Sequence, residues 1–548
     1  MIQKVIIRRF KRFREETFIL PGHIVLAGPN NMGKTTILQA IAAWSLALQR
    51  WRQLNHFHRP GGSYPKAPIA RQTFSAVPLR AFDLLWHDRQ YSGAMEIEVQ
   101  ASEGWTIAME IIADSTEQVY VRPKSDVSPD ILKEVKLTTA FVPPMTGLGT
   151  AEPVYQTPKI EQLLGLGRPG EVLRNLLVEA NRSGVFEELQ VSMQEMFGCY
   201  IELPNDTGAD ILVEYSDRPG GPSFDIACAG SGFQQVLMLV TFLLTRPGSV
   251  LLIDEPDAHL HVMLQDQIYS RLRAAAAKTN SQLVIATHSE VIINSVEPSA
   301  LCMLLDHPRP LETVAERRIL TQSLRVLTEV EIFNAQMVKG VLYVEGPTDI
   351  RLLLIFARKL NHPMRSHFIQ KIMLKKIVSD IRPGAPGIKA KEHYESLTLV
   401  RPDLPGLELV DGDARPEIQP TEITGRGLQR LRWKRYEIES YLFHPAALER
   451  LVERVVGGGE QSKKHREDLQ KYLDATYSTA FAKEPLKDYA FLTNLKARTE
   501  ILPPALSAAG LINFPESRYL EIAEIMKPEE IHHEVGEKFD LIQQAFGL

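Results

Sequence analysis

The 548-residue chain has few cysteines, and their spacing suggests no shared role. It contains three, Cys199, Cys228 and Cys302, which are far apart and odd in number. A disulfide framework or a cysteine-rich zinc site needs closely and regularly spaced cysteines, so this pattern argues against both. The low cysteine use suits a reducing compartment, and we expect the protein to be cytoplasmic.

Long apolar runs are also missing. No stretch of about 18 apolar residues occurs, so we expect no membrane span and no membrane partner. The longest apolar segment, 236–244, is expected to form a buried helix. The N-terminus is basic but has neither an apolar core nor a small-residue cleavage site, so it does not read as a signal peptide.

Neither sign of charge is in large excess. The formal net charge is −5, which argues against a general polyanion binder. Basic residues gather locally: segment 358–391 has nine Lys or Arg against one acid, Asp380, and segment 425–435 is a second cluster. One such run is commonly a solvated helix face, whereas the two together predict a track for a phosphate backbone. The length predicts two or three domains.

The first distinctive pattern is a phosphate-binding loop. Segment 23–42 reads as a strand, a loop and a helix, and the loop matches G-x-x-x-x-G-K-[ST]. In such a loop backbone N–H groups cradle phosphates, Lys34 reaches the β- and γ-phosphates, and the Thr35 hydroxyl ligates Mg²⁺. The predicted ATP-binding residues here are Gly28, Asn30, Asn31, Gly33, Lys34, Thr35 and Thr36.

Two further strands are expected to complete this site. The strand in segment 249–261 ends in Asp254, predicted to hold Mg²⁺, and Glu255, predicted to polarise the attacking water. A buried acidic pair needs a metal or a cation to offset its desolvation, and the loop supplies both. The strand in segment 281–294 ends at His288, which we interpret as a catalytic sensor of the γ-phosphate.

A Gly-Ser-Gly turn at 230–232 enters a helix between these motifs. The order of the motifs resembles that in the head of ABC-type ATPases: Walker A at 28–36, this turn at 230–234, Walker B at 250–255, then Asp257 and His288. Two positions depart from that family's Leu-Ser-Gly-Gly-Gln signature. The resemblance implies that Ser231 and Gly232 contact ATP held by a second subunit, that Asp257 is the D-loop residue that adjoins ATP, and that the protein is a homodimer.

About 190 residues separate Walker A from the signature. They show no sustained heptads, unlike SMC-type proteins, and instead alternate like strands at 93–100 and 106–112. We therefore expect a compact head with a helical dimerisation insert near 158–200, which could also support a tetramer. Gln72 is one candidate for the Q-loop glutamine, whose position the sequence leaves open.

The second half of the chain collects acids at the ends of expected strands. The strand before Glu345 is followed by a helix that begins near Asp349, and a later strand ends in a D-x-D motif. Carboxylate ligands without His or Cys select Mg²⁺ or Mn²⁺, and two such ions support phosphoryl transfer. Helix caps and surface turns are the alternative reading. The candidate metal ligands are Glu345, Asp349, Asp411, Asp413, Glu437 and Glu439, with Glu345, Asp411 and Asp413 also expected to be catalytic.

Strand-Glu-Gly followed by strand-D-x-D resembles the TOPRIM domain. An ABC-type head followed by a TOPRIM domain resembles the overcoming-lysogenization-defect (OLD) family of nucleases, as in bacterial anti-phage effectors. The implied fold is α/β: an ABC-type P-loop ATPase domain at 1–335, then a TOPRIM domain with a helical C-terminal part at 336–548. The resemblance implies Mg²⁺-ATP in the head and a two-metal site of Mg²⁺ or Mn²⁺, which Asp349 and Glu439 complete, with Glu437 as the rival of Glu439. A catalytic lysine is also implied, for which Lys487 and Lys496 are candidates.

The resemblance implies an ATP-hydrolysing, metal-dependent endonuclease or nickase that acts on DNA, as an anti-phage defence effector with a possible partner protein or RNA. Two alternatives stay open: a ribonuclease that cuts tRNA or other RNA, and a RecF-like DNA-binding repair ATPase that does not cleave. The sequence does not settle the target sequence, the trigger, or whether ATP activates or inhibits cleavage.

Overall fold

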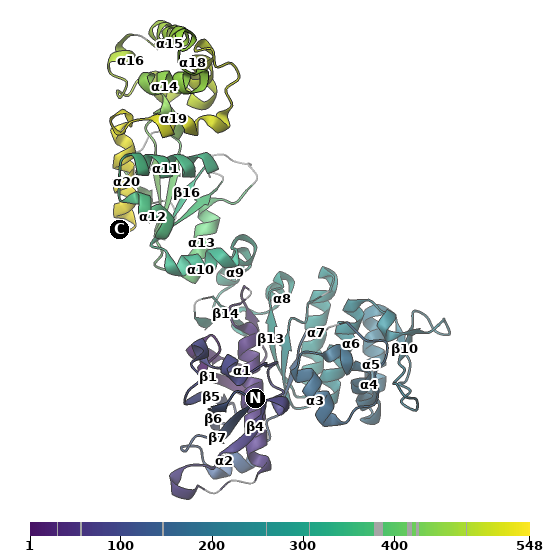
Figure 1. The fold of residues 1–548 in the computed structure, drawn as a ribbon. Helices are drawn as coiled ribbons and strands as arrows, with labels where there is room; N and C mark the ends of the chain where they lie inside the picture. The colour runs from purple at the N-terminus through teal and green to yellow at the C-terminus, as the bar shows by residue number, and fades with distance from the viewer. Residues whose placement is uncertain are drawn as a thin grey trace. The chain divides into compact units, whose positions relative to one another are not determined.

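The computed structural model describes residues 1–548 except 30, 55–56, 58, 145–146, 259, 306, 378–386, 414–418, 423–426 and 478. The chain forms two compact units, Met1–Leu324 and Arg325–Leu548, and each is described by itself (Figure 1). The described part of the chain contains no helix that is long and apolar enough to cross a membrane.

The division between the units falls earlier than the expected boundary at 335. The difference is α10 (Glu329–Met337), which packs on α13 (Ala390–Val400) of the second unit. Glu331 of α10 forms ion pairs with Lys375 and with His393, the latter at 3.3 Å. These partly buried contacts attach the helix to the second unit.

A mostly parallel sheet forms the centre of the first unit, in the order β15-β14-β3-β13-β12-β8. Its central strands are continuous apolar runs, as expected for strands covered on both faces. Only the edge strand β15 runs antiparallel. The strands are β3 (Ile24–Ala27), β8 (Thr139–Val142), β12 (Val250–Asp254), β13 (Gln282–Thr287), β14 (Leu301–Leu304) and β15 (Pro308–Pro310).

An antiparallel sheet in the order β2-β1-β5-β6-β7-β4 packs beside it. Helix α1 (Lys34–Gln53) contacts strands of both sheets (Figure 1). Trp44 and Trp51 on this helix are fully buried in the shared core. The strands are β1 (Ile2–Phe10), β2 (Phe13–Ile19), β4 (Ala67–Ala70), β5 (Ala94–Ala101), β6 (Thr106–Ser115) and β7 (Gln118–Pro123).

The remaining helices of the first unit include those in the expected insert. Helices α4 and α5 lie within 158–200 and pack on α6, which carries the signature turn. A small sheet in the order β11-β10-β9 adjoins them. The bounds are α2 (Pro129–Glu134), α3 (Thr157–Gly165), α4 (Leu173–Arg182), α5 (Phe186–Phe197), α6 (Ser231–Thr245), α7 (Val262–Lys278), α8 (Glu290–Ser295), β9 (Tyr200–Ile201), β10 (Glu214–Ser216) and β11 (Phe224–Asp225). Helix α9 (Val314–Val326) spans the division between the units.

The second unit is built on a sheet in the order β17-β16-β18-β20-β19, parallel except for β19. Leu342, Val344, Leu407 and Leu409 belong to its main apolar core. The other residues of these strands alternate to the opposite face, where Tyr343 is in register with Glu408. The strands are β16 (Gly340–Val344), β17 (Ile372–Lys376), β18 (Gly406–Val410), β19 (Thr421–Glu422) and β20 (Leu428–Arg432).

Helices make up the rest of the second unit, and the region after residue 444 is helical as expected. Two of them, α11 and α19, pack against each other beside the sheet (Figure 1). The bounds are α11 (Pro347–Lys359), α12 (Met364–Gln370), α14 (Pro445–Val456), α15 (Glu460–Tyr477), α16 (Thr479–Lys483), α17 (Ala490–Asn494), α18 (Leu502–Ala508), α19 (Leu520–Ile525) and α20 (His533–Ala545).

Candidate functional site

The phosphate-binding loop connects β3 to α1, as the sequence predicts. Gly33 has a φ of 97°, and a Cβ there would lie 2.5 Å from the Phe13 ring, so only glycine fits. The Lys34 ammonium is buried and donates hydrogen bonds to the carbonyls of Gly28 (2.7 Å) and Pro29 (2.8 Å). Asn31 also has positive φ, Thr36 lies in the first turn of α1, and the predicted Asn30 lies outside the described residues. The loop is shaped to surround an anion.

The predicted Mg²⁺ ligands Thr35 and Asp254 meet directly. The Thr35 hydroxyl lies 2.9 Å from Oδ2 and 3.1 Å from Oδ1 of Asp254. Burial raises the pKa of the Asp254 carboxyl to about 6, and this hydrogen bond opposes the shift. A hydroxyl in the first turn of α1 and a carboxylate at the carboxyl end of β12 fit a hard divalent ion, which would neutralise the buried charge.

Glu255 and His288 form the next pair. The Nδ1 atom of His288 lies 3.6 Å from Oε1 of Glu255, and the histidine lowers the pKa of Glu255 while Glu255 raises the pKa of His288. Glu255 has a φ of 47°, a left-handed conformation that is uncommon for this residue and often marks functional positions. The strained turn leads directly to Asp257, which accepts a 2.5 Å hydrogen bond from Thr287 of β13. Burial raises the pKa of Asp257.

The signature turn divides into an outward and an inward part. Ser231 is exposed at the start of α6 and Gly232 follows it, half-buried. Gln234 is buried, and its side-chain amide donates to the carbonyls of Ile226 and Ala229, each at 3.1 Å. Gln234 therefore fixes the turn, while Ser231 is presented to the surface. Gln72 is exposed in a short helical turn, and its carbonyl accepts a hydrogen bond from Gln162.

The sequence reading missed the support that the β1–β2 hairpin gives to the loop. Arg12 donates a hydrogen bond to the Asn31 carbonyl, and the Phe13 ring lies against Gly33. Lys11 donates to Gln39 of α1 at 2.5 Å. The sequence signal for this contact is weak, because a basic residue beside an aromatic one is common in hairpins.

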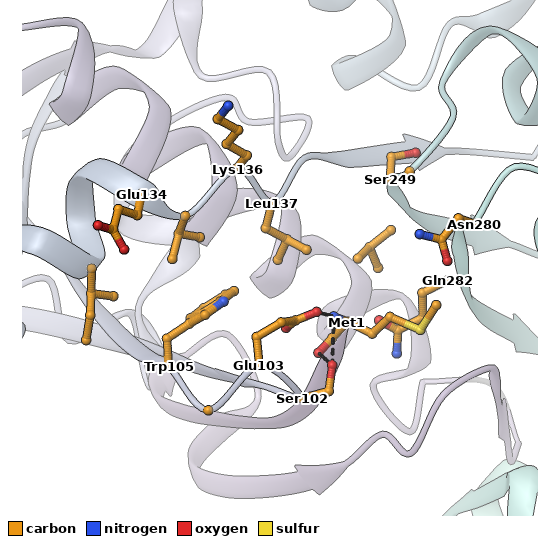
Figure 2. A pocket seen from close by; sticks show the side chains of 15 residues that line it. Met1, Ser102, Glu103, Trp105, Glu134, Lys136, Leu137, Ser249, Asn280 and Gln282 are labelled. Carbon is orange, nitrogen blue, oxygen red and sulfur yellow. Dashed lines mark hydrogen bonds and ion pairs between the residues drawn. The ribbon is translucent and has the colours of Figure 1, made fainter.

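A cavity of about 860 Å³ lies at the opposite edge of the parallel sheet (Figure 2). Val250 and Gln282, which line it, are the first residues of β12 and β13, whereas the phosphate-binding loop follows the carboxyl end of β3. Gln282 is engaged with the backbone of Ile2 and Gly22. The N-terminal ammonium pairs with Glu103 at 2.6 Å. This cavity is therefore separate from the nucleotide site.

In the second unit the fold brings together five of the six predicted acids, here termed the acid cluster: Glu345, Asp349, Asp411, Glu437 and Glu439. Glu345 follows β16 and Asp411 follows the neighbouring β18, and the Asp411 N–H lies 3.5 Å from Oε1 of Glu345. Asp349 accepts a 2.9 Å hydrogen bond from the Gly346 N–H in the first turn of α11. The predicted Asp413 is exposed beside residues 414–418, which lie outside the described residues.

Tight backbone packing fixes the D-x-D turn. The Gly412 N–H donates to the Tyr436 carbonyl at 2.9 Å, and a Cβ on Gly412 would lie 2.3 Å from the carbonyl oxygens of Trp433 and Arg435. The middle position of this D-G-D sequence therefore requires glycine. The same contact brings the segment of Glu437 and Glu439 beside Asp411.

The acid cluster is strongly electronegative; Glu437 and Glu439 are buried, and the other three members are half-buried. Burial first, and then the charges of Glu345 and Asp349, raise the pKa of Asp411 to about 9. Burial and Glu345 raise the pKa of Asp349 to about 6, and burial and Glu437 raise the pKa of Glu439 to about 7. Carboxyls that are so costly to ionise indicate a site for cations.

The structure separates the two rival glutamates. Both carboxylate oxygens of Glu437 lie next to Arg498. Oε1 accepts a 2.7 Å hydrogen bond from the Arg498 backbone N–H, and Oε2 lies 3.6 Å from the guanidinium. Glu439 is also buried; its electrostatic neighbours are Glu437, Asp349 and the more distant charge of Arg498, with which it has no direct contact among the described ion pairs. Glu439 is thus the better placed of the two to share a cation with Asp349.

The two candidate lysines also differ. Lys487 is exposed and pairs with Glu484 at 2.5 Å on its own turn. The Lys496 ammonium lies 5.9 Å from the centre of the Tyr436 ring, beside the segment of the acid cluster. Arg498, two residues on, directly contacts a cluster member, and the sequence reading did not identify it. About 60 residues separate Arg498 from Glu437, and no motif joins them.

The donor set of the acid cluster fits Mg²⁺ or Mn²⁺, which prefer carboxylate oxygens. Within the described residues no three His, Cys, Asp or Glu side chains are already arranged around a common metal position. A metal would therefore have to draw the carboxylates of Asp349, Asp411 and Glu439 closer together.

Some residues of the basic segments form ion pairs within the second unit, whereas others, such as Arg365, Lys376 and Lys391, are exposed, so the phosphate track stays a prediction. Arg430 is bound to the fully buried Glu408 at 2.6 Å, and Arg435 is buried with Asp488 as its ion-pair partner. Arg358 pairs with Glu524. The register of β20 with β18 places Arg430 opposite Glu408, which a count of charges along the sequence does not reveal. Arg382 and Arg426 lie outside the described residues.

Comparison with known proteins bears on the first unit. Residues 154–294 match a family described as "AAA domain, putative AbiEii toxin, Type IV TA system". This region includes the signature turn, the Walker B acids and His288. Together with the geometry of Lys34, Thr35 and Asp254, the match defines the first unit as a P-loop ATPase domain.

Two solved structures are similar at a lower level. One is the Smc head domain with an extended coiled coil bound to the C-terminal domain of ScpA, derived from Pyrococcus furiosus: 12% identity, TM-score 0.33, covering 58% of this chain and 97% of that one. The other is the recombination mediator protein RecF-ATPrS in the RecFOR pathway: 12% identity, TM-score 0.31, covering 55% of this chain and 95% of that one. No curated protein matches the chain.

Proposed function

We propose that the chain is an ATP-hydrolysing, metal-dependent endonuclease or nickase that acts on DNA, with a TOPRIM-like second unit as in the OLD family. The acid cluster carries the proposal, because carboxylates from three separate stretches of chain converge at the carboxyl edge of a parallel sheet. Acids gathered in this way would repel a nucleic acid unless divalent cations lay between them. Two such cations stabilise the attacking and leaving oxygens in phosphoryl transfer.

In this proposal the first unit is an ABC-type head that works as a homodimer. Ser231 supports this, since it is exposed at the start of α6 while Gln234 is buried. Lys34 and Thr35 bind Mg²⁺-ATP, Glu255 activates water, and His288 responds to the γ-phosphate. The dimer sets when the second unit cuts, in the role of a defence effector.

RNA, including tRNA, is the alternative substrate, since a phosphate backbone is common to both. The non-cleaving, RecF-like reading is less favoured. A domain that only binds a polyanion gains nothing from the acid cluster, and its basic residues Arg430 and Arg435 are engaged internally.

A cleavage assay tests the proposal. The full chain is incubated with supercoiled plasmid or total tRNA, with Mn²⁺ or Mg²⁺, with and without ATP. The variants are Asp411→Asn and, as a matched control, Asp403→Asn, which is exposed in a turn and pairs with Arg401. We expect nicking or linearisation by the wild type and Asp403→Asn, and none by Asp411→Asn, with ATP hydrolysis unchanged in all three.

Cleavage of tRNA alone would replace DNA with RNA as the substrate. Equal cleavage by Asp411→Asn would trace the activity to a contaminant or to another site. Absence of cleavage of both nucleic acids, with normal ATP hydrolysis, would favour the binding ATPase.

A further inference from the structure

Arg498 occupies an unusual turn beside the acid cluster. It lies in η9 (Ala497–Ile501), a turn of π-helix that precedes α18. An extra residue in a helical turn is often retained because it brings a side chain to a functional site. Here the turn is held on both sides of Arg498: its N–H donates to Oε1 of Glu437 at 2.7 Å, and its carbonyl accepts a hydrogen bond from the buried Tyr519 hydroxyl at 3.3 Å.

The side chain of Arg498 is held far less tightly than its backbone. The guanidinium is 40% exposed and lies 3.6 Å from Glu437 on the inner side and 3.9 Å from the exposed Glu516 on the outer side. Both separations exceed hydrogen-bond length. The guanidinium can therefore change partners at low cost while the backbone stays in place.

The charge of Arg498 acts on most of the acid cluster. It lowers the pKa of Asp349 and Glu439, against the larger effect of burial. Burial lowers the pKa of Arg498, but a larger combined effect raises it: the charges of Glu437, Glu439, Glu516 and Asp411. Arg498 is thus a counter-ion shared by acids that would also be ligands of a divalent cation.

We propose that Arg498 is a built-in counter-ion that competes with the divalent cation for the acid cluster and moves outward to Glu516 when the cation binds. This inference rests on the proposed function, because it concerns the same site. A guanidinium and a divalent ion repel each other across a few ångströms, and partial burial preserves part of that repulsion. Occupation of the cluster by metal therefore requires that Arg498 withdraw from Glu437. Arg498 makes metal binding weaker and reversible.

Substitution of Arg498 and substitution of its outer partner Glu516 are expected to change Mn²⁺ affinity in opposite directions, which permits a sharp test. Replacing Arg498 by glutamine removes the competitor, so Mn²⁺ should bind more tightly, by about tenfold given the partial exposure of the guanidinium. Replacing Glu516 by glutamine removes the outer partner, so Arg498 stays with Glu437 and Mn²⁺ should bind more weakly, by about threefold. Arg498→Lys keeps the charge and should bind Mn²⁺ like the wild type.

The measurement is Mn²⁺ binding to the nucleotide-free full chain, followed by calorimetry and by the electron paramagnetic resonance of free Mn²⁺. The relevant component is the one that Asp411→Asn removes, which separates the acid cluster from the P-loop site. The unfolding temperature of each variant shows that it is folded; Glu516 is exposed, so Glu516→Gln remains informative even if Arg498→Gln fails to fold.

Tighter binding in Arg498→Gln with weaker binding in Glu516→Gln would establish the competition. Unchanged or weaker Mn²⁺ binding in Arg498→Gln, or tighter binding in Glu516→Gln, would overturn it. This readout does not depend on cleavage. A chain that cuts neither DNA nor RNA would refute the proposed function and still show whether Arg498 competes with the metal.

Discussion

Thr35 and Asp254 are 219 positions apart in the sequence, and their side chains lie 2.9 Å apart at the closest. Because burial raises the pKa of Asp254 to about 6, the carboxylate needed for Mg²⁺ is lost as the pH falls below that value. We expect Mg²⁺-dependent binding of a non-hydrolysable ATP analogue to weaken between pH 7.5 and 5.5. Calorimetry should show this pH step in the wild type and in Thr35→Ser, which keeps the hydroxyl. Asp254→Asn should bind weakly at every pH, and a persistent pH step in that variant would assign the titration to another group.

Glu255 is predicted to activate the attacking water. Glu255→Gln should lower the ATPase turnover number by about 10²- to 10⁴-fold, the range typical of a lost general base, while ATP still binds. Steady-state hydrolysis and nucleotide binding would be measured in parallel. The control is Glu312→Gln, an exposed acid outside the site. Turnover within a few-fold of the wild type in Glu255→Gln would place the base elsewhere. Sedimentation in ATP would show whether this variant accumulates as a dimer.

The acid cluster should destabilise the metal-free protein. With the pKa of Asp411 raised to about 9, the native state binds protons more tightly than the unfolded state, so stability falls as the pH rises from about 4 to 9. Asp411→Asn removes this cost and should raise the unfolding temperature of the second unit by roughly 5 °C at pH 8 without metal. Scanning calorimetry with and without Mn²⁺ measures it. A lower unfolding temperature in Asp411→Asn would show that the carboxyl stabilises the fold.

Gly412 is predicted to be indispensable for the D-x-D turn. A Cβ there would lie 2.3 Å from two carbonyl oxygens, so Gly412→Ala must shift the segment that precedes Glu437 and Glu439. We expect a loss of about 1–3 kcal/mol in the free energy of unfolding, and loss of Mn²⁺ binding at the acid cluster. Gly536→Ala, within α20 with no atom near its Cβ position, is the matched control and should be neutral or stabilising. Full Mn²⁺ binding by Gly412→Ala would contradict the proposed site.

Glu331 is expected to stabilise the attachment of α10. Burial raises the pKa of Glu331, but His393 and Lys375 lower it further, so the net shift is downward. The stabilisation from the Glu331 carboxylate is therefore present above about pH 4.3, the ordinary pKa of glutamate, and is lost as the pH falls below that value. Glu331→Gln should cost about 2 kcal/mol at pH 7 and less at pH 4. Urea unfolding at the two pH values measures both, with the exposed Glu392→Gln as the control. An equal cost at both pH values would indicate that packing, not charge, is lost.

The local motifs were predictable because each lies within a short stretch of sequence. The loop around Lys34 and the acids at the ends of β12, β16 and β18 follow from strand-loop-helix patterns. The pairing of Thr35 with Asp254 arises because β3 and β12 lie on either side of β13 in one parallel sheet and end at the same edge.

What could not be predicted depends on contacts between segments that share no motif. Arg498 reaches Glu437 through a π-helical turn, and sequence patterns do not signal an inserted residue. Arg430 counts as a surface charge in the sequence, yet the pairing of β18 with β20 places it against Glu408. The earlier division between the units reflects the packing of α10 on α13 and the contacts of Glu331 with Lys375, 44 positions away, and with His393.

The first glycine of the phosphate-binding loop rests on a neighbouring strand. A Cβ at Gly28 would lie 2.2 Å from the carbonyl oxygen of Leu304, the last residue of β14. The loop therefore has no free space between Gly28 and β14, and a nucleotide that pushes Gly28 toward β14 must displace Leu304. Beyond Leu304 the chain runs through β15 into α9, the helix that leads to the second unit. The phosphate-binding loop therefore packs against the end of β14, the strand that precedes β15 and α9 in the chain.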